Sequence, residues 1–282
     1  MNGILMINYF LAGNKYSEQT ELYLKAAEKY KISLSICTNA QRCPEADFVL
    51  FLDKDVACAR ELELSGVRVF NSAQAIALCD DKAMTYLALR NSGLPMPKTL
   101  IAPMTFFKSD WSSNPFLQIA EEELGFPMIV KEACGSFGWQ VWMVQSQEEL
   151  ALKLSECSPK RVVLQEYISS SHGKDVRINI VGGEPVAAMY RYSETDFRAN
   201  ISAGGKMRPY VPSADQVYVA TEACRCLGLD FGGVDLLFGE NGTPILCEVN
   251  SNAHIKNILD CTGINVAEHI IDYILRKVEQ NQ

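Results

Sequence analysis

The sequence has 282 residues and a formal net charge of -8 at pH 7, and 48% of its residues are hydrophobic and 21% charged. This is the composition of an ordinary globular protein, with enough chain for one large domain or two to three small ones. The acidic balance argues against a broad surface for nucleic acid or anionic membrane, and no run of about 18 uncharged apolar residues predicts a membrane span.

Short apolar strands alternate with helices in the first third of the chain, a pattern typical of a parallel sheet with helices on its faces. The predicted strands are residues 3–11, 32–38, 47–52 and 67–71, and the predicted helices are residues 17–30 and 55–66. Ser72 is then expected to cap a long helical region that runs to about Leu89, and Gly93 and Pro95 end it. These signals predict a first domain over residues 1–95.

The rest of the chain reads as two segments of mixed strands and helices. Residues 96–168 contain predicted helices at 116–125 and after Ser146, and predicted strands at 127–133, 140–144 and 161–168. Residues 169–282 contain a predicted hairpin at 175–192 that turns at Gly182-Gly183, a helix at 215–228, a second hairpin and a final helix at 265–279. The predicted fold class is therefore α/β, with an N-terminal parallel-sheet domain followed by two α+β subdomains.

The second hairpin carries acidic residues on otherwise apolar strands. Asn241-Gly242 favours a two-residue turn because both central positions of a type I′ turn need positive φ. Counting outward from that turn sets Asp235 opposite Glu248, and Asn250 shares the face of Glu248. The apolar neighbours on the first strand then face the other side of the hairpin, namely Val234, Leu236 and Phe238.

Two facing carboxylates repel each other, so their pairing needs a reason. Mg²⁺ is a good one, because it takes oxygen ligands from a few protein groups and the remainder from phosphate and water. Asp235, Glu248 and Asn250 are the predicted metal ligands. The alternative is an exposed polar face on which the charges happen to align.

Two lysines could contact phosphate. Lys131 ends an apolar strand and precedes a loop with two glycines, and loop amides can bind phosphate oxygens. Lys82 lies in the long predicted helical region, where the simpler interpretation is an ordinary solvated lysine. The strand that ends at residues 165–168 leads into a linker between domains, which is a common place for a ligand cleft.

Arg177, Arg191, Arg198 and Asn200 form a candidate anion-binding set on and after the first hairpin. The planar fork of a guanidinium group suits carboxylate and phosphate. The alternative for each arginine is a surface ion pair.

Taken in order, these segments resemble the ATP-grasp superfamily and its RimK-like branch of α-L-glutamate ligases. The resemblance rests on VFN, DDK, PMIVKEACGSFG, VVLQEYI, GKDVRINIVGGEPVAAM, DFRAN, GGVDLL and EVNSN. It implies an N-terminal Rossmann-like domain over residues 1–95, a central lid subdomain over 96–168 and a C-terminal subdomain with the metal site over 169–282. It implies an ATP-dependent carboxylate–amine ligase that forms an acyl-phosphate and releases ADP and phosphate.

The resemblance also implies roles for individual residues. Lys82 and Lys131 would contact nucleotide phosphates, under a loop formed by Gly135, Ser136, Phe137 and Gly138. Gln165, Glu166, Tyr167 and Ile168 would form the adenine hinge, and Asp175 would help to hold the nucleotide. Asp235, Glu248 and Asn250 would bind two Mg²⁺ ions, for which Mn²⁺ could substitute. The groups near the γ-phosphate and the acceptor carboxylate would be Arg191, Arg198 and Asn200.

The sequence departs from this branch in two places. The lid loop carries the bulky Phe137 and Trp139, and NAHIKN replaces a Ser-Pro-Gly stretch after EVNS. The second departure lies beside the amino-acid pocket of the family, so the added amino acid can differ from glutamate. His254 is either a substrate contact or simply a polar loop residue. The expected partners are ATP, an amino acid and a carboxylate acceptor that is a small molecule, a carrier protein or a protein C-terminus, without nucleic acid or membrane. The alternatives are an ATP-grasp phosphotransferase and a non-catalytic ATP-binding regulator.

Ten scattered cysteines, many within apolar segments, predict free thiols in a reducing cytoplasm. The resemblance further implies a homo-oligomer, a dimer or a tetramer, although no feature of the sequence decides this point.

Overall fold

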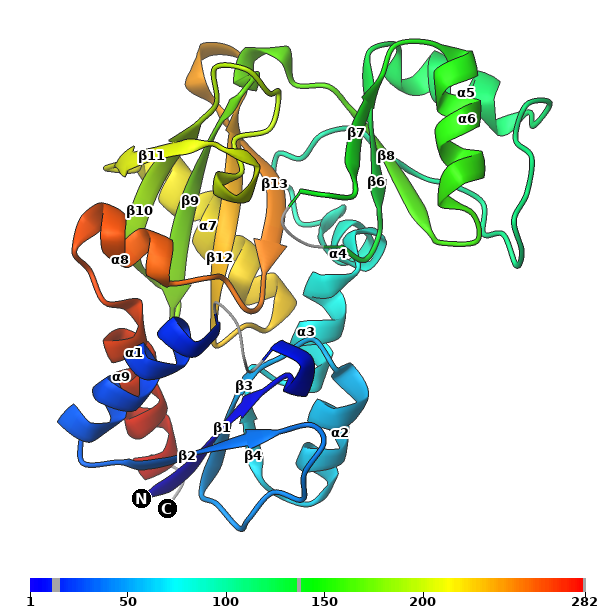
Figure 1. Cartoon of the computed structure of the whole chain (residues 1–282). Coiled ribbons are helices and arrows are strands. Elements are labelled where there is room, and N and C mark those ends of the chain that lie inside the picture. Colours follow the sequence, from blue (N-terminus) through cyan, green and yellow to red (C-terminus); the bar gives the residue numbers. More distant parts are fainter. Residues whose placement is uncertain (12–15, 136–137, 281–282) are drawn as a thin grey trace.

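The computed structural model describes residues 1–11, 16–135 and 138–280, which form three sheets (Figure 1). The first sheet is parallel, with strand order β2-β1-β3-β4. Its strands are β1 (Asn2–Ile7), β2 (Ser33–Thr38), β3 (Phe48–Leu52) and β4 (Arg68–Phe70). Helices α1 (Tyr16–Lys29) and α2 (Val56–Leu64) connect them. The predicted parallel sheet is confirmed.

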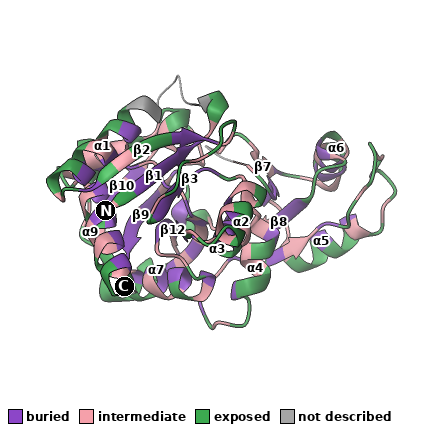
Figure 2. Ribbon diagram, turned by 90° about the horizontal axis from the view of Figure 1, so that it is seen from below, coloured by how far each residue is buried: buried purple, intermediate pink, exposed green. Residues whose placement is uncertain are grey.

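Helices cover both faces of this sheet, so every residue of β3 is buried (Figure 2). On one face Leu50 packs in a cluster with α1 and with the last helix, α9 (Val266–Glu279). On the other face Val49 packs with α2 and with α3 (Ala73–Asp80). The strand predicted at residues 3–11 is shorter in the structure, because the Asn8 side chain accepts a hydrogen bond from the amide of Phe10 at 3.0 Å and a 3₁₀ turn, Tyr9–Leu11, follows.

The helical region predicted from Ser72 to about Leu89 is confirmed, and it consists of two helices, because the chain breaks at Asp81 between α3 and α4 (Lys82–Leu89). Asp81 has φ -111° and ψ 109°, and its carboxylate accepts hydrogen bonds from the amides of Ala83 at 2.8 Å and Met84 at 3.2 Å. A carboxylate that caps free amides in this way starts a new helix. Lys82 is consequently the first residue of α4, and its amide donates to the Ala133 carbonyl at 2.9 Å.

The second sheet is antiparallel, with strand order β5-β8-β6-β7. It consists of β5 (Thr99–Ile101), β6 (Met128–Glu132), β7 (Val141–Val144) and β8 (Val162–Glu166). Helices α5 (Phe116–Leu124) and α6 (Gln147–Cys157) complete its core. Ser146 caps α6 as predicted, since its hydroxyl accepts from the Glu149 amide at 3.3 Å. Strand β5 was not predicted.

The third sheet is antiparallel, with strand order β11-β10-β9-β12-β13. It consists of β9 (Lys174–Val181), β10 (Glu184–Tyr192), β11 (Lys206–Pro209), β12 (Phe231–Phe238) and β13 (Pro244–Asn250). Gly182 and Gly183 form the predicted turn with φ of 60° and 86°. Helix α7 (Ala214–Leu227) covers the apolar face, and α8 (Lys256–Thr262), which was not predicted, follows β13. The other face packs against α8 and α9 through Ala187 and Met189, and the second sheet's subdomain lies beside β13 (Figure 1).

The first and third sheets share one apolar core. Val181, Met189 and Phe231 of the third sheet lie in the same buried cluster as Leu5 and Phe48 of the first. The chain segments at both ends therefore form one packed body, to which the central subdomain is attached. The boundaries at residues 95 and 168 remain a proposal.

Asn71 joins the two sheets of this body through its side chain. Its amide nitrogen donates to the carbonyls of Phe231 at 2.9 Å and Ser251 at 3.0 Å. Its carbonyl oxygen accepts from the amides of Asp230 at 2.7 Å and Phe231 at 3.2 Å. With 1% of its surface exposed, Asn71 replaces the water that these backbone groups would otherwise need.

Of the described residues, none lies in a helix that is long and apolar enough to cross a membrane. All ten cysteines are free thiols, as predicted.

We expect Asn71→Ala to lower the free energy of unfolding by about 2–4 kcal/mol, because several buried backbone groups lose their partner at once. Urea denaturation followed by circular dichroism measures this change. Asn39→Ala is the matched control, since Asn39 is partly exposed and accepts one hydrogen bond, from the Tyr9 amide at 3.1 Å. Equal losses in the two variants would contradict a joining role for Asn71.

Candidate active site

A cleft lies between the second and third sheets and encloses about 900 Å³ of space that opens to solvent. Most of the residues predicted for the site line it. They are Lys82, Lys131, Gly135, Gly138, Gln165, Glu166, Tyr167, Ile168, Asp175, Arg191, Arg198, Asn200, Asp235 and Glu248. Of the other three, Ser136 and Phe137 lie outside the described residues, and Asn250 lies beside the cleft, where its side-chain nitrogen approaches the Gly233 carbonyl at 3.5 Å.

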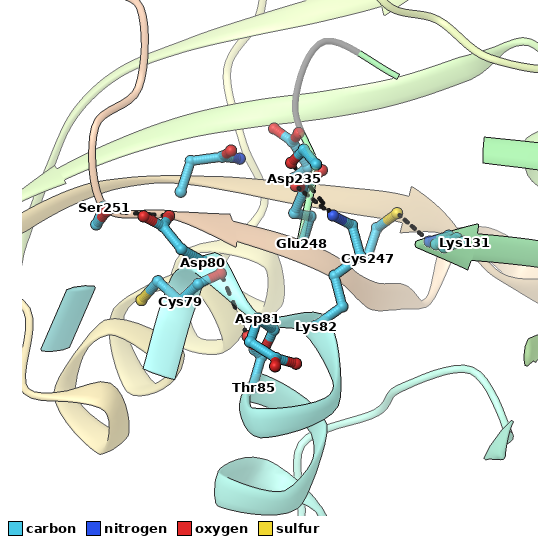
Figure 3. A network of polar contacts seen from close by, with 12 residues as sticks. Cys79, Asp80, Asp81, Lys82, Thr85, Lys131, Asp235, Cys247, Glu248 and Ser251 are labelled. Atoms are coloured by element: carbon cyan, nitrogen blue, oxygen red, sulfur yellow. Dashed lines mark hydrogen bonds and ion pairs between the residues drawn. The ribbon is translucent and has the colours of Figure 1, made fainter. Parts of the chain in front are cut away.

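Two ammonium groups enter the cleft from different elements (Figure 3). Lys131 is the second-last residue of strand β6, is 8% exposed, and has its Nζ 3.8 Å from the Sγ of Cys247. Lys82 starts α4, and its Nζ lies 3.4 Å from the Gly135 carbonyl and 3.7 Å from Oε1 of Glu248. Because the chain breaks at Asp81, Lys82 starts a new helix and its side chain reaches the cleft. In a continuous helix it was expected to be an ordinary solvated lysine.

The acidic hairpin has the predicted pairing but not the predicted turn. Asn241 and Gly242 both have positive φ, yet they belong to a three-residue loop that the Gly239 amide closes with the Thr243 carbonyl at 2.7 Å. The strand register next to the loop is therefore one residue away from the predicted one. A β-bulge at Cys247 then inserts one residue, so that Asp235 faces Glu248 after all.

Asp235 belongs to a buried network of ion pairs on the polar face of the third sheet. Arg177 donates to both of its oxygens at 2.7 Å, and Arg191 lies 3.0 Å from Oδ2. Arg191 also donates to both oxygens of Asp175, at 2.6 and 2.7 Å. Asp175, Arg191 and Asp235 are each at most 8% exposed. Arg177–Asp235 and Arg191–Asp175 are thus two bidentate pairs, and the contact of Arg191 with Asp235 links them, which fixes all four side chains.

The network sets the charge state of its two acids. Burial raises the pKa of Asp235, but the charges and hydrogen bonds of Arg177 and Arg191 outweigh burial and hold that pKa below its ordinary value. Burial raises the pKa of Asp175 above its ordinary value, because Arg191 is its one bonded guanidinium and Asp235 repels it. The network therefore keeps Asp235 ionised.

The residues at the hairpin suit a hard divalent cation. Each carboxylate oxygen can accept two hydrogen bonds, so Oδ1 of Asp235, which accepts one from Arg177, keeps a lone pair. The Glu248 side chain is 30% exposed and points into the cleft. No group of three or more His, Cys, Asp or Glu residues able to hold a metal occurs in the described chain. Two carboxylates and one amide, completed by phosphate oxygens, are the kind of partial ligand set that Mg²⁺ uses.

Arg198 connects the third sheet's subdomain to the lid loop. Its Nη1 donates to the carbonyls of Gly138 at 2.7 Å and Val141 at 3.3 Å, while Asp196 holds its Nε and Nη2 at 3.1 and 2.8 Å. Gly138 has φ 74°, and a Cβ there would lie 2.8 Å from Oδ1 of Asn200. Glycine is thus required where the loop meets Asn200.

At the predicted hinge, the polar side chains hold the backbone in place. The Glu166 carboxylate accepts from the Lys98 amide at 2.8 Å, and the Gln165 side chain donates to the Thr99 hydroxyl at 3.0 Å. The Tyr167 hydroxyl is hydrogen-bonded to Nδ1 of His172. Base recognition by backbone groups of residues 165–168 stays a prediction.

Sequence reasoning missed the apolar walls of the cleft. Ile129 lies two residues before Lys131 and Leu237 two residues after Asp235, so each shares the face of a predicted polar residue. That spacing was available in the sequence, but such residues read as ordinary core. Trp139, predicted to enlarge the lid, is 67% exposed.

We expect Arg191→Met to lower the free energy of unfolding by about 3–5 kcal/mol at pH 7, because it leaves two buried carboxylates short of a cation. Loss of Arg191 raises the folded-state pKa of both acids, so the deficit relative to wild type should shrink as the pH falls towards about 4. Urea denaturation at several pH values measures it. Arg225→Met, which removes an exposed ion pair with Glu222, should cost at most about 1 kcal/mol. A deficit independent of pH would contradict the electrostatic explanation.

Three relatives place the chain among known sequences. It is 33% identical over 250 residues to the MG012 homolog of Mycoplasma pneumoniae, covering 84% of this chain and 86% of that protein. It is 34% identical over 230 residues to beta-citrylglutamate synthase B of Danio rerio, covering 79% of this chain but 54% of that longer protein. It is 31% identical over 221 residues to a probable alpha-L-glutamate ligase of Syntrophotalea carbinolica, covering 77% and 70%.

Two solved structures share the fold across almost the whole chain. D-cycloserine synthetase superposes with a TM-score of 0.77 at 18% identity, covering 99% of this chain and all of that one. D-alanine–D-alanine ligase of Bacillus anthracis in complex with ATP superposes with a TM-score of 0.75 at 18% identity, covering all of both chains. These likenesses confirm the predicted ATP-grasp fold.

The family model for the RimK-like ATP-grasp domain matches residues 79–274, which is more than half of the chain. The match confirms the predicted reaction class, an ATP-dependent carboxylate–amine ligase, and the family uses ATP and Mg²⁺. The chain that forms this cleft belongs to the RimK-like ATP-grasp family.

Proposed function

We propose that this protein joins the amine of an amino acid to a carboxylate acceptor, with MgATP bound in the cleft between the second and third sheets. The observation that carries the proposal is the convergence of opposite charges across this cleft. Lys82 and Lys131 approach from one side, and Asp235 and Glu248 face each other on the other. Ammonium groups suit phosphate oxygens, and the facing carboxylates suit the Mg²⁺ ions that accompany a nucleotide.

The individual roles follow from this arrangement. Lys82 and Lys131 bind phosphates beneath the lid loop, residues 135–138, and residues 165–168 hold the adenine. Asp235, Glu248 and Asn250 supply ligands to two Mg²⁺ ions. Arg198 and Asn200 meet the γ-phosphate and the acceptor carboxylate once the lid is closed. Arg191 and Asp175 act through Asp235, which they hold in position, a narrower role than the sequence predicted.

The chemistry has two displacement steps. The acceptor carboxylate attacks the γ-phosphorus, ADP leaves, and an acyl-phosphate forms. The amine then attacks the acyl carbon, and phosphate leaves with the bonding electrons while the amine loses a proton. Lys82 and Lys131 offset charge that develops on the transferred phosphoryl group, and bound Mg²⁺ would add to this effect. Contact of Arg198 with the Gly138 carbonyl keeps the lid loop near the phosphates, where it excludes water.

Glutamate is the first amino acid to test. Two relatives, a beta-citrylglutamate synthase and a probable alpha-L-glutamate ligase, are named for it. The segment after Asn250 departs from the glutamate-ligase pattern, so other amino acids belong in the same screen. We further propose that the protein works in a reducing cytoplasm, where its ten thiols stay free. A homo-oligomer remains a prediction.

We expect MgATP to raise the thermal unfolding midpoint of the wild type, since a ligand at 100 times its Kd adds about 2.7 kcal/mol of stability. Glu248→Gln should lose the Mg²⁺-dependent part of that increase, because it removes a carboxylate without disturbing the buried arginines. Glu240→Gln, an exposed residue in the loop of the same hairpin, is the control and should behave like wild type. An identical Mg²⁺-dependent increase in Glu248→Gln would contradict the metal site.

The ligase reaction is tested by ADP release with MgATP, each L-amino acid and a panel of carboxylates that includes citrate. We expect release that needs both an amino acid and a carboxylate, with a product whose mass equals their sum less one water. Arg198→Met should reduce the rate at least tenfold, because Arg198 supports the lid loop. ADP release without an amine-containing product would instead indicate phosphoryl transfer, and MgATP binding without any turnover would indicate a regulatory ATP-binding protein.

A further inference from the structure

The carboxyl edge of the first sheet carries charged residues that the nucleotide cleft does not use. Asp53 and Lys54 follow β3, and ligands of parallel sheets bind outside such edges. Asn8, which follows β1, donates to both oxygens of Asp53 at 3.2 and 3.1 Å, and the Lys54 amide donates to one of them at 2.7 Å. These bonds fix the backbone at Lys54, and none of them involves its ammonium group.

Lys54 meets an acid from a different part of the chain. Its Nζ lies 3.1 Å from Oδ1 of Asp80, the last residue of α3. The hydroxyl of Ser251, which directly follows β13, approaches the same oxygen at 3.4 Å (Figure 3). Three segments, from the first sheet, α3 and the third sheet, therefore converge at one point.

The ion pair at this point is incomplete. The second oxygen of Asp80, Oδ2, is buried and accepts no hydrogen bond from the part of the chain that the structure describes. The Lys54 side chain is 42% exposed, whereas that of Asp80 is 13% exposed. Buried polar atoms are normally satisfied, so a buried acceptor without a partner, beside a half-exposed ammonium, indicates a place for a ligand with both a donor and an anionic group.

This point adjoins the acidic hairpin. Asp80 lies two residues before Lys82, whose Nζ is 3.7 Å from Glu248, and Ser251 lies one residue after Asn250. Burial raises the pKa of Asp80, and the nearby charge of Glu248 adds to the rise while Lys54 opposes it. A ligand at Asp80 is thus next to the site where the acyl-phosphate would form. Arg177, a further cation near this hairpin, is bound to both oxygens of Asp235.

We propose that Lys54 and Asp80 bind the two charged groups of the amino-acid substrate, Lys54 its α-carboxylate and Asp80 its α-ammonium. The substrate would contact both residues, and its ammonium would donate to Oδ2 of Asp80, which has no other hydrogen-bond partner among the described residues. Because the charge of Glu248 acts on Asp80, this orientation directs the amine towards the side where the acyl-phosphate would form. The inference rests on the proposed ligase function and assigns the residues that select an α-amino acid.

The test uses the full-length protein saturated with MgADP and isothermal titration calorimetry. L-glutamate, glutarate (without the amine) and 4-aminobutyrate (without the α-carboxylate) are titrated into wild type, Lys54→Gln and Asp80→Asn. Lys25→Gln, an exposed residue of α1 paired with Glu21, is the control. If a screen of the twenty L-amino acids finds a better binder than glutamate, that amino acid and its two analogues replace this series.

We expect each variant to bind the amino acid at least tenfold more weakly than wild type or Lys25→Gln does. Removing the α-carboxylate from the ligand should weaken binding to wild type but not to Lys54→Gln, and removing the amine should weaken binding to wild type but not to Asp80→Asn. Unchanged MgADP affinity shows that both variants are folded. If wild type binds an amino acid and both variants bind it equally well, this inference fails while the proposed function stands. If no amino acid binds to wild type, both fail.

Discussion

The buried pairing of Asp235 with Arg177 and Arg191 is the interaction on which the candidate site depends. Charges in a protein interior are tolerated when they are paired and hydrogen-bonded, and each of these groups meets that condition. The strands that carry them alternate, so that Val176, Ile178 and Val234 face α7 while the charges face the cleft. The two-residue alternation of the strands therefore places an apolar core on one side of the sheet and the buried ion pairs on the other.

Three consecutive residues, 80–82, connect the acidic hairpin to the rest of the molecule. Asp80 meets Lys54 of the first sheet, Asp81 caps α4 and lies 3.4 Å from Arg161 of the central subdomain, and Lys82 reaches Glu248. A continuous helix would turn these side chains by 100° per residue and separate them along one axis. The break at Asp81 instead lets one short segment contact all three subdomains. Residues 80–82 thereby connect the central subdomain, the nucleotide cleft and the edge of the parallel sheet.

The sequence predicted what local pattern controls, and it failed where tertiary contacts decide. Alternation of short strands and helices was enough for the parallel sheet, and Gly182-Gly183 for the first hairpin. The facing of Asp235 and Glu248 was predicted correctly although the turn was not, because a longer loop and a bulge at Cys247 shift the register in opposite directions. Neither change has a local signal strong enough to detect. At the helix break, the local cap by Asp81 is joined by a bond from the Lys82 amide to Ala133, some fifty residues away, which no local pattern predicts.

The ion network shows the same limit from another side. Arg177, Arg191 and Asp235 were recognisable as functional candidates by residue type, but their mutual pairing follows from the order of β10, β9 and β12 in the sheet. The apolar lining of the cleft was hidden because Ile129 and Leu237 satisfy the same strand pattern as core residues. Family resemblance supplied the nucleotide and metal roles that these patterns alone left open.

The shared core of the first and third sheets has a consequence for the order in which the chain can fold during synthesis. One face of the parallel sheet is closed by α2 and α3, which follow it closely in sequence, but the other face packs against α9 and Phe231. The central subdomain encloses its own core within residues 102–164. On the ribosome, the central subdomain can thus fold early, while one face of the parallel sheet stays uncovered until the last helix emerges. We therefore expect chaperones to bind nascent chains at the face of β1 and β3 that α9 later covers, rather than at the central subdomain.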